Sequence, residues 1–161
     1  MYKSRILIMA IVLLVPAAAG YFMIRAKLSG NEVSRLTDLA QEHALASRYD
    51  DAIADLTAAL EITPQNPELH LLRGQMYLAL YEWDKALTDY NAALELAPDY
   101  ADAYYYRGVL YASILQTGLD TRDDALADFR RYLELAPTGD HAADAAQYVA
   151  DLEAAQDALN G

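Results

Sequence analysis

The sequence of 161 residues contains no cysteine, a single tryptophan and two phenylalanines, together with 7 glycines and 5 prolines. The absence of cysteine excludes disulfide bonds, thiolate zinc sites, a cysteine nucleophile and lipidation of an N-terminal cysteine. The small share of glycine and proline excludes a collagen-like or low-complexity chain. A chain of this length is typical of one domain.

Basic residues are also scarce: the chain has 12 of them against 24 acidic residues, and its formal net charge is −12. Residues 1–27 contain four of the basic residues and no acidic residue, so the rest of the chain is strongly acidic. An acidic surface repels the phosphate backbone of DNA and RNA. We therefore expect no nucleic-acid partner.

One long apolar run is present, and it covers residues 6–24, 19 positions without a charged side chain. At about 1.5 Å per residue, a helix of this length just crosses a hydrocarbon core of about 30 Å. Basic residues flank the run at Lys3, Arg5, Arg25 and Lys27. We expect residues 1–27 to be a single-pass membrane anchor. The slight excess of positive charge on the N-terminal side favours an extracytoplasmic body.

The same segment also fits a cleaved signal peptide. In that interpretation Lys3 and Arg5 form the basic region, residues 6–15 the apolar region, and residues 17–19, all alanine, the cleavage site. Cleavage would release a secreted or periplasmic protein that begins at Gly20. The apolar run continues past that site to Ile24, which favours the anchor, and both interpretations stay open.

The most informative feature of the rest of the chain is an internal repeat. The segment Ala-Ile-Ala-Asp-Leu from Ala52 is matched by Ala-Leu-Thr-Asp-Tyr from Ala86 and by Ala-Leu-Ala-Asp-Phe from Ala125. A proline follows each segment at the same distance, at positions 64, 98 and 137. The second step is longer than the first, so the third copy holds five additional residues, which lie between Tyr111 and Ala125.

This pattern resembles the tetratricopeptide repeat (TPR), a helix–turn–helix unit whose length of about 34 residues equals the step from Ala52 to Ala86. The second copy matches best, with Gly74, Tyr77, Ala86, Tyr90, Ala93 and Pro98 in register. The resemblance implies an all-α fold in which three TPR helical hairpins and a C-terminal capping helix stack into an α-solenoid. The apolar run adds one N-terminal hydrophobic helix before it. The expected boundaries are 28–32 for a linker, 33–66, 67–100 and 101–139 for the repeats, and 140–161 for the capping helix.

Apolar spacing and helix-end signals place the helices within these units. Asn66 followed by Pro67 is typical of a helix start, and Thr121 with Asp124 indicates a capping box. Asp99 is expected to cap the following helix. The helices are expected at 33–47, 50–62, 67–80, 83–96, 101–117, 122–135 and 140–159.

Residues that could carry chemistry are few. The three histidines, His43, His70 and His141, include no pair at the spacing of two ligands on one helix turn. The acidic residues at 120, 123 and 124 lack the pattern of a calcium-binding loop. No phosphate-binding loop or nucleophile elbow is present in the sequence. We expect no enzyme activity, cofactor, metal or small-molecule substrate.

The resemblance implies a concave groove formed by the first helix of each repeat, with Glu68 and Asp102 at its rim. Members of the family that grip the C-terminal carboxylate of chaperones use lysine, arginine and asparagine in this groove. The corresponding positions here include Thr37, Leu72 and Asp102, so we expect no binding of this kind. The predicted groove residues are Thr37, Gln41, Leu71, Gln75, Leu78, Tyr105 and Val109.

The function expected from the sequence is therefore that of a membrane-tethered interaction module or scaffold, which binds a partner protein or peptide in its groove. Two alternatives stay open. One is a soluble secreted or periplasmic TPR module after signal cleavage. The other is a structural subunit of a membrane complex.

Overall fold

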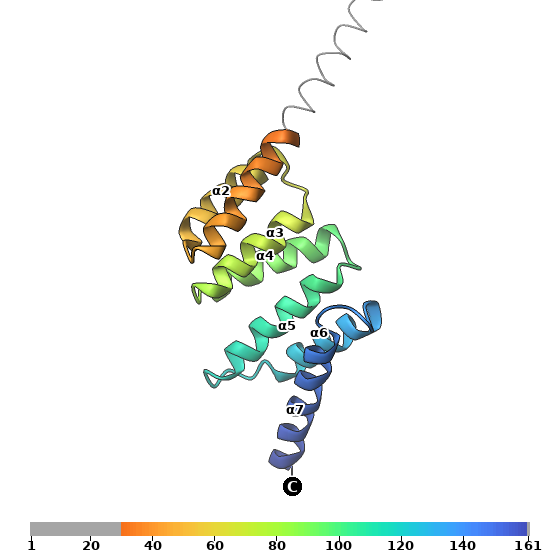
Figure 1. Ribbon diagram of the computed structural model, residues 1–161. Helices are drawn as coiled ribbons and strands as arrows, with labels where there is room; N and C mark the ends of the chain where they lie inside the picture. The colour runs from red at the N-terminus through yellow and green to blue at the C-terminus, as the bar shows by residue number, and fades with distance from the viewer. Residues whose placement is uncertain (1–29, 161) are drawn as a thin grey trace, which may run out of the picture.

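The computed structural model describes residues 30–160, which form seven helices and no strand. Figure 1 shows the helices running back and forth in pairs, each pair stacked on the one before it. The first helix in this part of the chain extends through residues 30–45. It is followed by α2 (Tyr49–Ile62), α3 (Pro67–Ala79), α4 (Trp83–Leu96), α5 (Ala101–Leu115), α6 (Arg122–Leu135) and α7 (Ala142–Asn160).

The helices before α7 form three hairpins: the first covers residues 30–62, the second residues 67–96 and the third residues 101–135. Helix α3 packs on α4 and α5 on α6 within hairpins, while α2 packs on α3 and α4 on α5 between hairpins. Helix α7 packs against α6 at the end of the stack. This arrangement confirms the predicted all-α solenoid for the described part of the chain.

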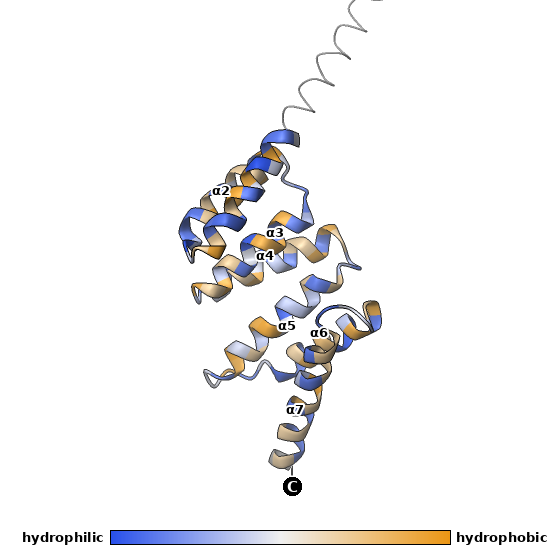
Figure 2. Cartoon of the chain, viewed as in Figure 1, coloured by the Kyte–Doolittle hydropathy of each residue, from blue (hydrophilic) through white to orange (hydrophobic). Residues whose placement is uncertain are grey.

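The predicted anchor or signal segment, residues 1–27, lies outside the described residues, so the leading hydrophobic helix stays a prediction. None of the helices within residues 30–160 combines the length and the apolar character needed to cross a membrane. Figure 2 shows that hydrophilic residues interrupt the apolar ones along the labelled helices.

Small residues let the two helices of each hairpin approach closely. Ala52, Ala86 and Ala125 are fully buried at equivalent positions of α2, α4 and α6. A Cβ atom added to Gly74 would lie 2.6 Å from Cε1 of Tyr90, which is closer than carbon atoms approach in proteins. At each of these small residues, a large side chain of the facing helix therefore fills the space between the two helices.

The helix ends agree with the sequence at one predicted cap and differ at two. The Asn66 side chain accepts hydrogen bonds from the backbone N–H groups of Glu68 (3.0 Å) and Leu69, as expected for a helix start. Thr121 makes no capping hydrogen bond, because its hydroxyl donates to the Tyr111 carbonyl across the inserted loop (2.6 Å). Asp99 lies one position too early to cap α5, whose N-cap residue is Tyr100.

Three predicted boundaries also need correction. Residues 30–32, predicted as linker, are helical, and Glu32 accepts a hydrogen bond from Arg35 one turn later (3.0 Å). The first helices of the first and third hairpins end earlier than predicted, at residues 45 and 115, because the chain leaves the helix in a tight turn. Ser47 and Tyr81, at equivalent positions of the first two repeats, both adopt positive φ in the turn inside their hairpin, 58° and 60°.

Candidate partner-binding surface

The predicted groove residues differ in how much surface they expose. Gln41 is exposed, and Thr37, Gln75, Leu78 and Val109 are partly buried. Leu71 and Tyr105 are only 4% and 8% exposed. The prediction that these two side chains lie open on the groove is wrong, because Leu71 packs between α4 and α5 and Tyr105 packs against the start of α7. Partner binding by any of these residues stays a prediction.

A small hollow opens beside the first helix. Its lining residues come from that helix, α2 and α3, and none of them is charged: Ala40, Gln41, Ala44, Leu56, Leu72 and Met76. Its volume is about 20 Å³, so it is a shallow apolar depression. We call it the N-terminal hollow. The sequence prediction had included only Gln41 of this set in the groove.

A larger hollow of about 280 Å³ lies between α5 and α7. We call it the C-terminal hollow, and its lining residues are Tyr105, Asp144, Gln147, Tyr148 and Asp151. The Gln147 side-chain amide donates a hydrogen bond to the Asp151 carboxylate (2.8 Å). The carboxylates of Asp144 and Asp151 are both exposed. The predicted groove had included only Tyr105 of this set.

Aromatic contacts fix the wall of the C-terminal hollow. The Tyr105 ring stacks on the His141 ring with centroids 4.1 Å apart and an interplanar angle of 4°. Tyr132 accepts a hydrogen bond from the His141 backbone N–H through its hydroxyl oxygen (3.0 Å), which holds the start of α7 in place. Tyr148 stacks on Phe129 at 4.6 Å. These contacts hold the two tyrosines that face the hollow in defined positions.

Tyr105 carries its hydroxyl group on a side chain that is almost completely buried where it borders the hollow. Burial raises the pKa of this hydroxyl to about 12, and the negative charge of Asp144 contributes to the same shift. The hydroxyl is therefore neutral at ordinary pH. It can both donate and accept a hydrogen bond at the hollow.

A second polar arrangement, which the sequence reasoning missed, joins neighbouring hairpins. The Arg73 guanidinium donates two hydrogen bonds to the buried Asp89 carboxylate, both 2.8 Å, and a third to Thr57 of the preceding hairpin (3.1 Å). The hydrogen bond to Asp89 raises the pKa of Arg73. We call this arrangement the arginine clasp of the second hairpin.

The third hairpin repeats the clasp in register. Arg107 donates to both Asp128 oxygens (2.7 and 2.8 Å) and to Asn91 of the second hairpin (2.7 Å). Burial raises the pKa of Asp128, and the Arg107 charge opposes this rise. Arg73 and Arg107 are separated by one repeat length, as are Thr57 and Asn91, and this spacing is the signal that could have revealed the clasp. Neither arginine is left to bind a partner's carboxylate.

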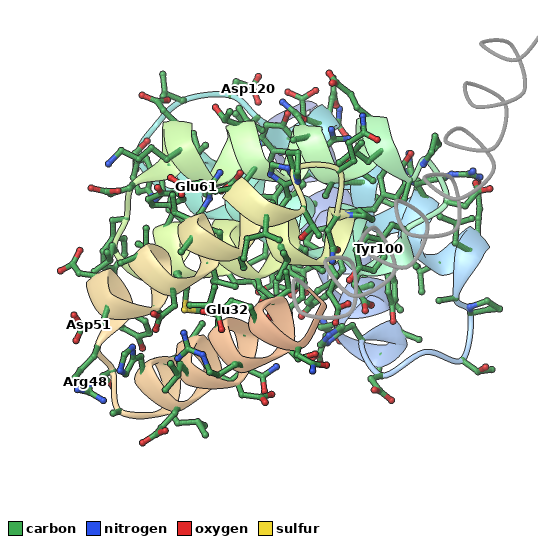
Figure 3. All side chains as sticks on the ribbon, turned by 90° about the horizontal axis from the view of Figure 1, so that it is seen from above. Glu32, Arg48, Asp51, Glu61, Tyr100 and Asp120 are labelled. Atoms are coloured by element: carbon green, nitrogen blue, oxygen red, sulfur yellow. The ribbon has the colours of Figure 1, made fainter. Side chains whose placement is uncertain are left out.

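Most of the other basic residues are also paired, so the exposed surface of the described part is acidic. Figure 3 shows Arg48 beside Asp51, with which it forms an ion pair, and Asp120 at the edge of the molecule. Within residues 30–160, no group of three side chains is arranged to hold a metal ion. Seven basic residues pair with carboxylates: Arg35, Arg48, Arg73, Lys85, Arg107, Arg130 and Arg131.

Comparison with known proteins agrees with this stack of hairpins. The family model of the TPR repeat matches residues 43–80 and 74–114. Residues 43–114 therefore match TPR repeats, and the described part of the chain is an all-helical TPR-like solenoid. No curated protein sequence matches the chain.

Several solved TPR domains have the same fold. The first TPR of Spaghetti (RPAP3), bound to an HSP90 peptide, has 25% identity and a TM-score of 0.70, with 78% of this chain and 94% of that chain covered. The first TPR domain of human RPAP3 has 27% identity and a TM-score of 0.64, with 75% and 94% covered. The Sgt2 TPR domain from Aspergillus fumigatus has 22% identity and a TM-score of 0.70, with 80% and 82% covered.

Proposed function

We propose that the chain is a protein–protein interaction module that holds a segment of a partner against the first helices of its hairpins. The observation that carries the proposal is the TPR match over two consecutive units of the stack. The first helices of the hairpins also border both hollows. The similar TPR domain of Spaghetti (RPAP3) is bound to a peptide. Catalysis is no part of this proposal.

The partner segment differs in chemistry from the acidic peptide bound to that TPR domain. Arg73 and Arg107 are held in the clasps, and Thr37, Leu72 and Asp102 carry no positive charge. Without basic side chains, a carboxylate that binds here loses water without gaining an ionic partner. We therefore expect the HSP90 peptide SRMEEVD not to bind in a fluorescence anisotropy titration. Micromolar binding of this peptide would contradict our view of the partner.

We also propose that residues 1–27 tether the module to a membrane, with the hairpins on the extracytoplasmic side. The support is the run of 19 uncharged residues, followed immediately by two basic residues in the next three positions. A tether would raise the local concentration of partners in the same membrane. The full-length protein should stay in the membrane pellet after carbonate extraction. A mature N-terminus at Gly20 would instead establish the soluble secreted or periplasmic module.

Site-specific crosslinking in the native membrane tests the interaction. A photoreactive amino acid at Gln75 of α3 is expected to join the protein to a defined partner. The same amino acid at Thr88, an exposed position of α4, is the control and should give no such product. Equal crosslinking from both positions would contradict binding by the first helices. Size analysis in mild detergent separates a free module from the remaining alternative, a stoichiometric subunit of a membrane complex.

A further inference from the structure

The turns inside the three hairpins lie along one edge of the stack, opposite to the turns that connect one hairpin to the next (Figure 1). We call this surface the hairpin-turn edge, and it comprises the turns and the adjoining helix ends, residues 45–51, 80–85 and 116–124. The first helix begins at residue 30 on the opposite edge. The hairpin-turn edge is therefore remote from the point at which the preceding part of the chain joins the first helix.

Each turn of this edge exposes one large apolar side chain. Leu45 is 90% exposed, Tyr81 79% and Leu119 62%. The other large apolar side chains that the structure describes as exposed, Ile62 and Leu96, reach only 37% and 40%. Single exposed apolar residues are common on protein surfaces, but a set gathered on one side is typical of a contact surface.

The backbone of Tyr81 adds a second observation. Its φ of 60° lies in the left-handed region, which glycine, asparagine and aspartate adopt far more readily than a bulky residue. The first hairpin has the small Ser47 at the equivalent position, with φ 58°. The exposed ring of Tyr81 gains little packing within the described chain that could offset this strain. A strained residue that the fold does not need indicates a functional position, and tyrosine is a common anchor of protein interfaces.

The hairpin-turn edge is also acidic, with seven acidic residues against three basic ones. Two of the basic residues pair within the edge: Arg48 with Asp51, and Lys85 with Glu82. Arg122 is the third. The other carboxylates of the edge form no ion pair within residues 30–160: Asp50, Asp84, Asp120, Asp123 and Asp124. Acidic residues stabilise the first turn of a helix, so this charge alone indicates no ligand. Beside exposed apolar side chains, it selects a positively charged partner.

We propose that the hairpin-turn edge is a second docking surface, which binds a basic amphipathic helix of a partner protein. The surface contains none of the predicted groove residues, so the inference goes beyond the proposed function. The apolar stripe of the helix covers Leu45, Tyr81 and Leu119. Lysine or arginine side chains at the margins of the stripe reach the carboxylates that follow each apolar residue in the sequence. A helix suits this surface because its apolar residues share one face and its basic residues flank that face.

The charge of the edge also argues against a membrane surface as the occupant. Anionic lipid headgroups attract basic segments and repel carboxylates. The edge lies opposite to the start of the first helix, to which any membrane tether in residues 1–27 is joined. A basic helix gains from both the apolar and the acidic side chains, whereas a lipid surface gains from the apolar ones alone.

The test uses the full-length protein in phosphatidylcholine nanodiscs and a fluorescein-labelled helical peptide of about 14 residues. The peptide has leucine on one face and lysine on both sides of that face. Fluorescence anisotropy, corrected with empty nanodiscs, should show saturable binding that weakens severalfold as the salt concentration rises from about 50 to about 300 mM. A peptide with glutamate in place of lysine should not bind. Tyr81→Asn combined with Leu119→Ser should weaken binding about tenfold. Both positions are exposed, and asparagine suits a positive φ.

The matched control is Ile62→Ser, at the end of α2 on the opposite edge, which should bind the lysine peptide as the unchanged protein does. Undiminished binding by the Tyr81→Asn, Leu119→Ser variant would show attraction by overall charge only and would overturn the docking surface. Binding no stronger than that of empty nanodiscs would also overturn it.

A photoreactive phenylalanine derivative in place of Tyr81 separates a protein partner from a membrane. It should join the protein to the lysine peptide. Labelling of lipid instead of the peptide would overturn the proposal and indicate that the edge meets the membrane surface. Crosslinking from Gln75 but not from Thr88 tests the groove separately, so the two surfaces can fail independently.

Discussion

The first and second hairpins have the same helix–turn–helix backbone but pack it in different ways. In the first hairpin, Ala40 faces an aliphatic side chain, Leu56. In the second, Gly74 occupies the equivalent position and faces the larger ring of Tyr90. The volume removed from one helix is thus compensated by volume added to the other. The comparison teaches that the repeat keeps the space between its helices constant and varies the residues that fill it.

The polar contacts of the two hairpins differ as well. In the second hairpin, Asp89 is buried and is held by two parallel hydrogen bonds from Arg73. In the first, Asp55 is more exposed, and His43 lies 2.9 Å from it without the angles of a hydrogen bond. A carboxylate as buried as that of Asp89 needs strong partners. The Asp55 side chain is 20% exposed, although its Oδ2 atom is buried without a hydrogen-bond partner.

The largest effect is expected from removal of the clasp carboxylate. Asp89→Ala leaves the half-buried Arg73 without its ionic partner and should lower the free energy of unfolding by about 3 kcal/mol. The equivalent change in the first hairpin, Asp55→Ala, should cost about 1 kcal/mol or less, since Asp55 accepts no hydrogen bond from His43 and its side chain is 20% exposed. Urea denaturation followed by circular dichroism measures both values. Equal losses would mean that the clasp adds nothing beyond the His43–Asp55 contact.

The next effect concerns the glycine that faces Tyr90. Gly74→Ala brings a methyl group within 2.6 Å of the ring and should lower the free energy of unfolding by about 2 kcal/mol, because the ring has to move. The double variant Gly74→Ala with Tyr90→Leu reproduces the Ala40–Leu56 pair of the first hairpin. A double-mutant cycle should therefore give a favourable coupling energy between the two changes. Purely additive losses would contradict the proposed volume exchange.

Most of this fold could be predicted from the sequence because packing of small against large residues recurs at a fixed spacing. Gly74, Ala86 and Tyr90 fall in register, and the structure brings them together as the repeat pattern predicted. The turn between α5 and α6 contains Gly118, which adopts φ 94°. These features depend on local spacing, which a single sequence displays directly.

The site was harder to predict because it depends on contacts between separate helices. Tyr105 was expected to lie open on the groove, but the start of α7 covers it through His141. The sequence shows that a capping helix follows the third repeat, but not which way it turns. The clasp was missed for another reason: Arg73 and Arg107 stand at matching repeat positions, but their significance depends on a carboxylate of another helix.

The third effect depends on pH and comes from Tyr105 of the third hairpin. The pKa of Tyr105 is about 12 in the folded protein, whereas an unfolded tyrosine has a pKa of about 10. Between these values only the unfolded state loses the proton, so stability falls as the pH rises from 10 towards 12. For this residue the loss is about 1.4 kcal/mol at pH 11.

Between pH 9 and 11, the Tyr105→Phe variant should therefore lose less stability than the unchanged protein. The difference should be about the contribution of one tyrosine, as measured by urea denaturation at each pH. The stacked ring is retained in this variant, so a change in packing does not explain the difference. An unchanged pH dependence would show that Tyr105 ionises at its ordinary pKa in the folded protein.

The smallest effect compares the equivalent aromatic residues of the second and third hairpins. Tyr90 is completely buried, and its hydroxyl has no hydrogen-bond partner among the described residues, while Phe129 fills the same place without a hydroxyl. Tyr90→Phe removes the unpartnered group and keeps the ring, so the free energy of unfolding should rise by about 1 kcal/mol. The reverse change, Phe129→Tyr, buries a new hydroxyl beside Gly108 and should lower it by a similar amount. A loss of stability in Tyr90→Phe would mean that this hydroxyl makes a favourable contact. Tyr90 and Phe129 would then differ in their polar contacts as well as in the volume of their side chains.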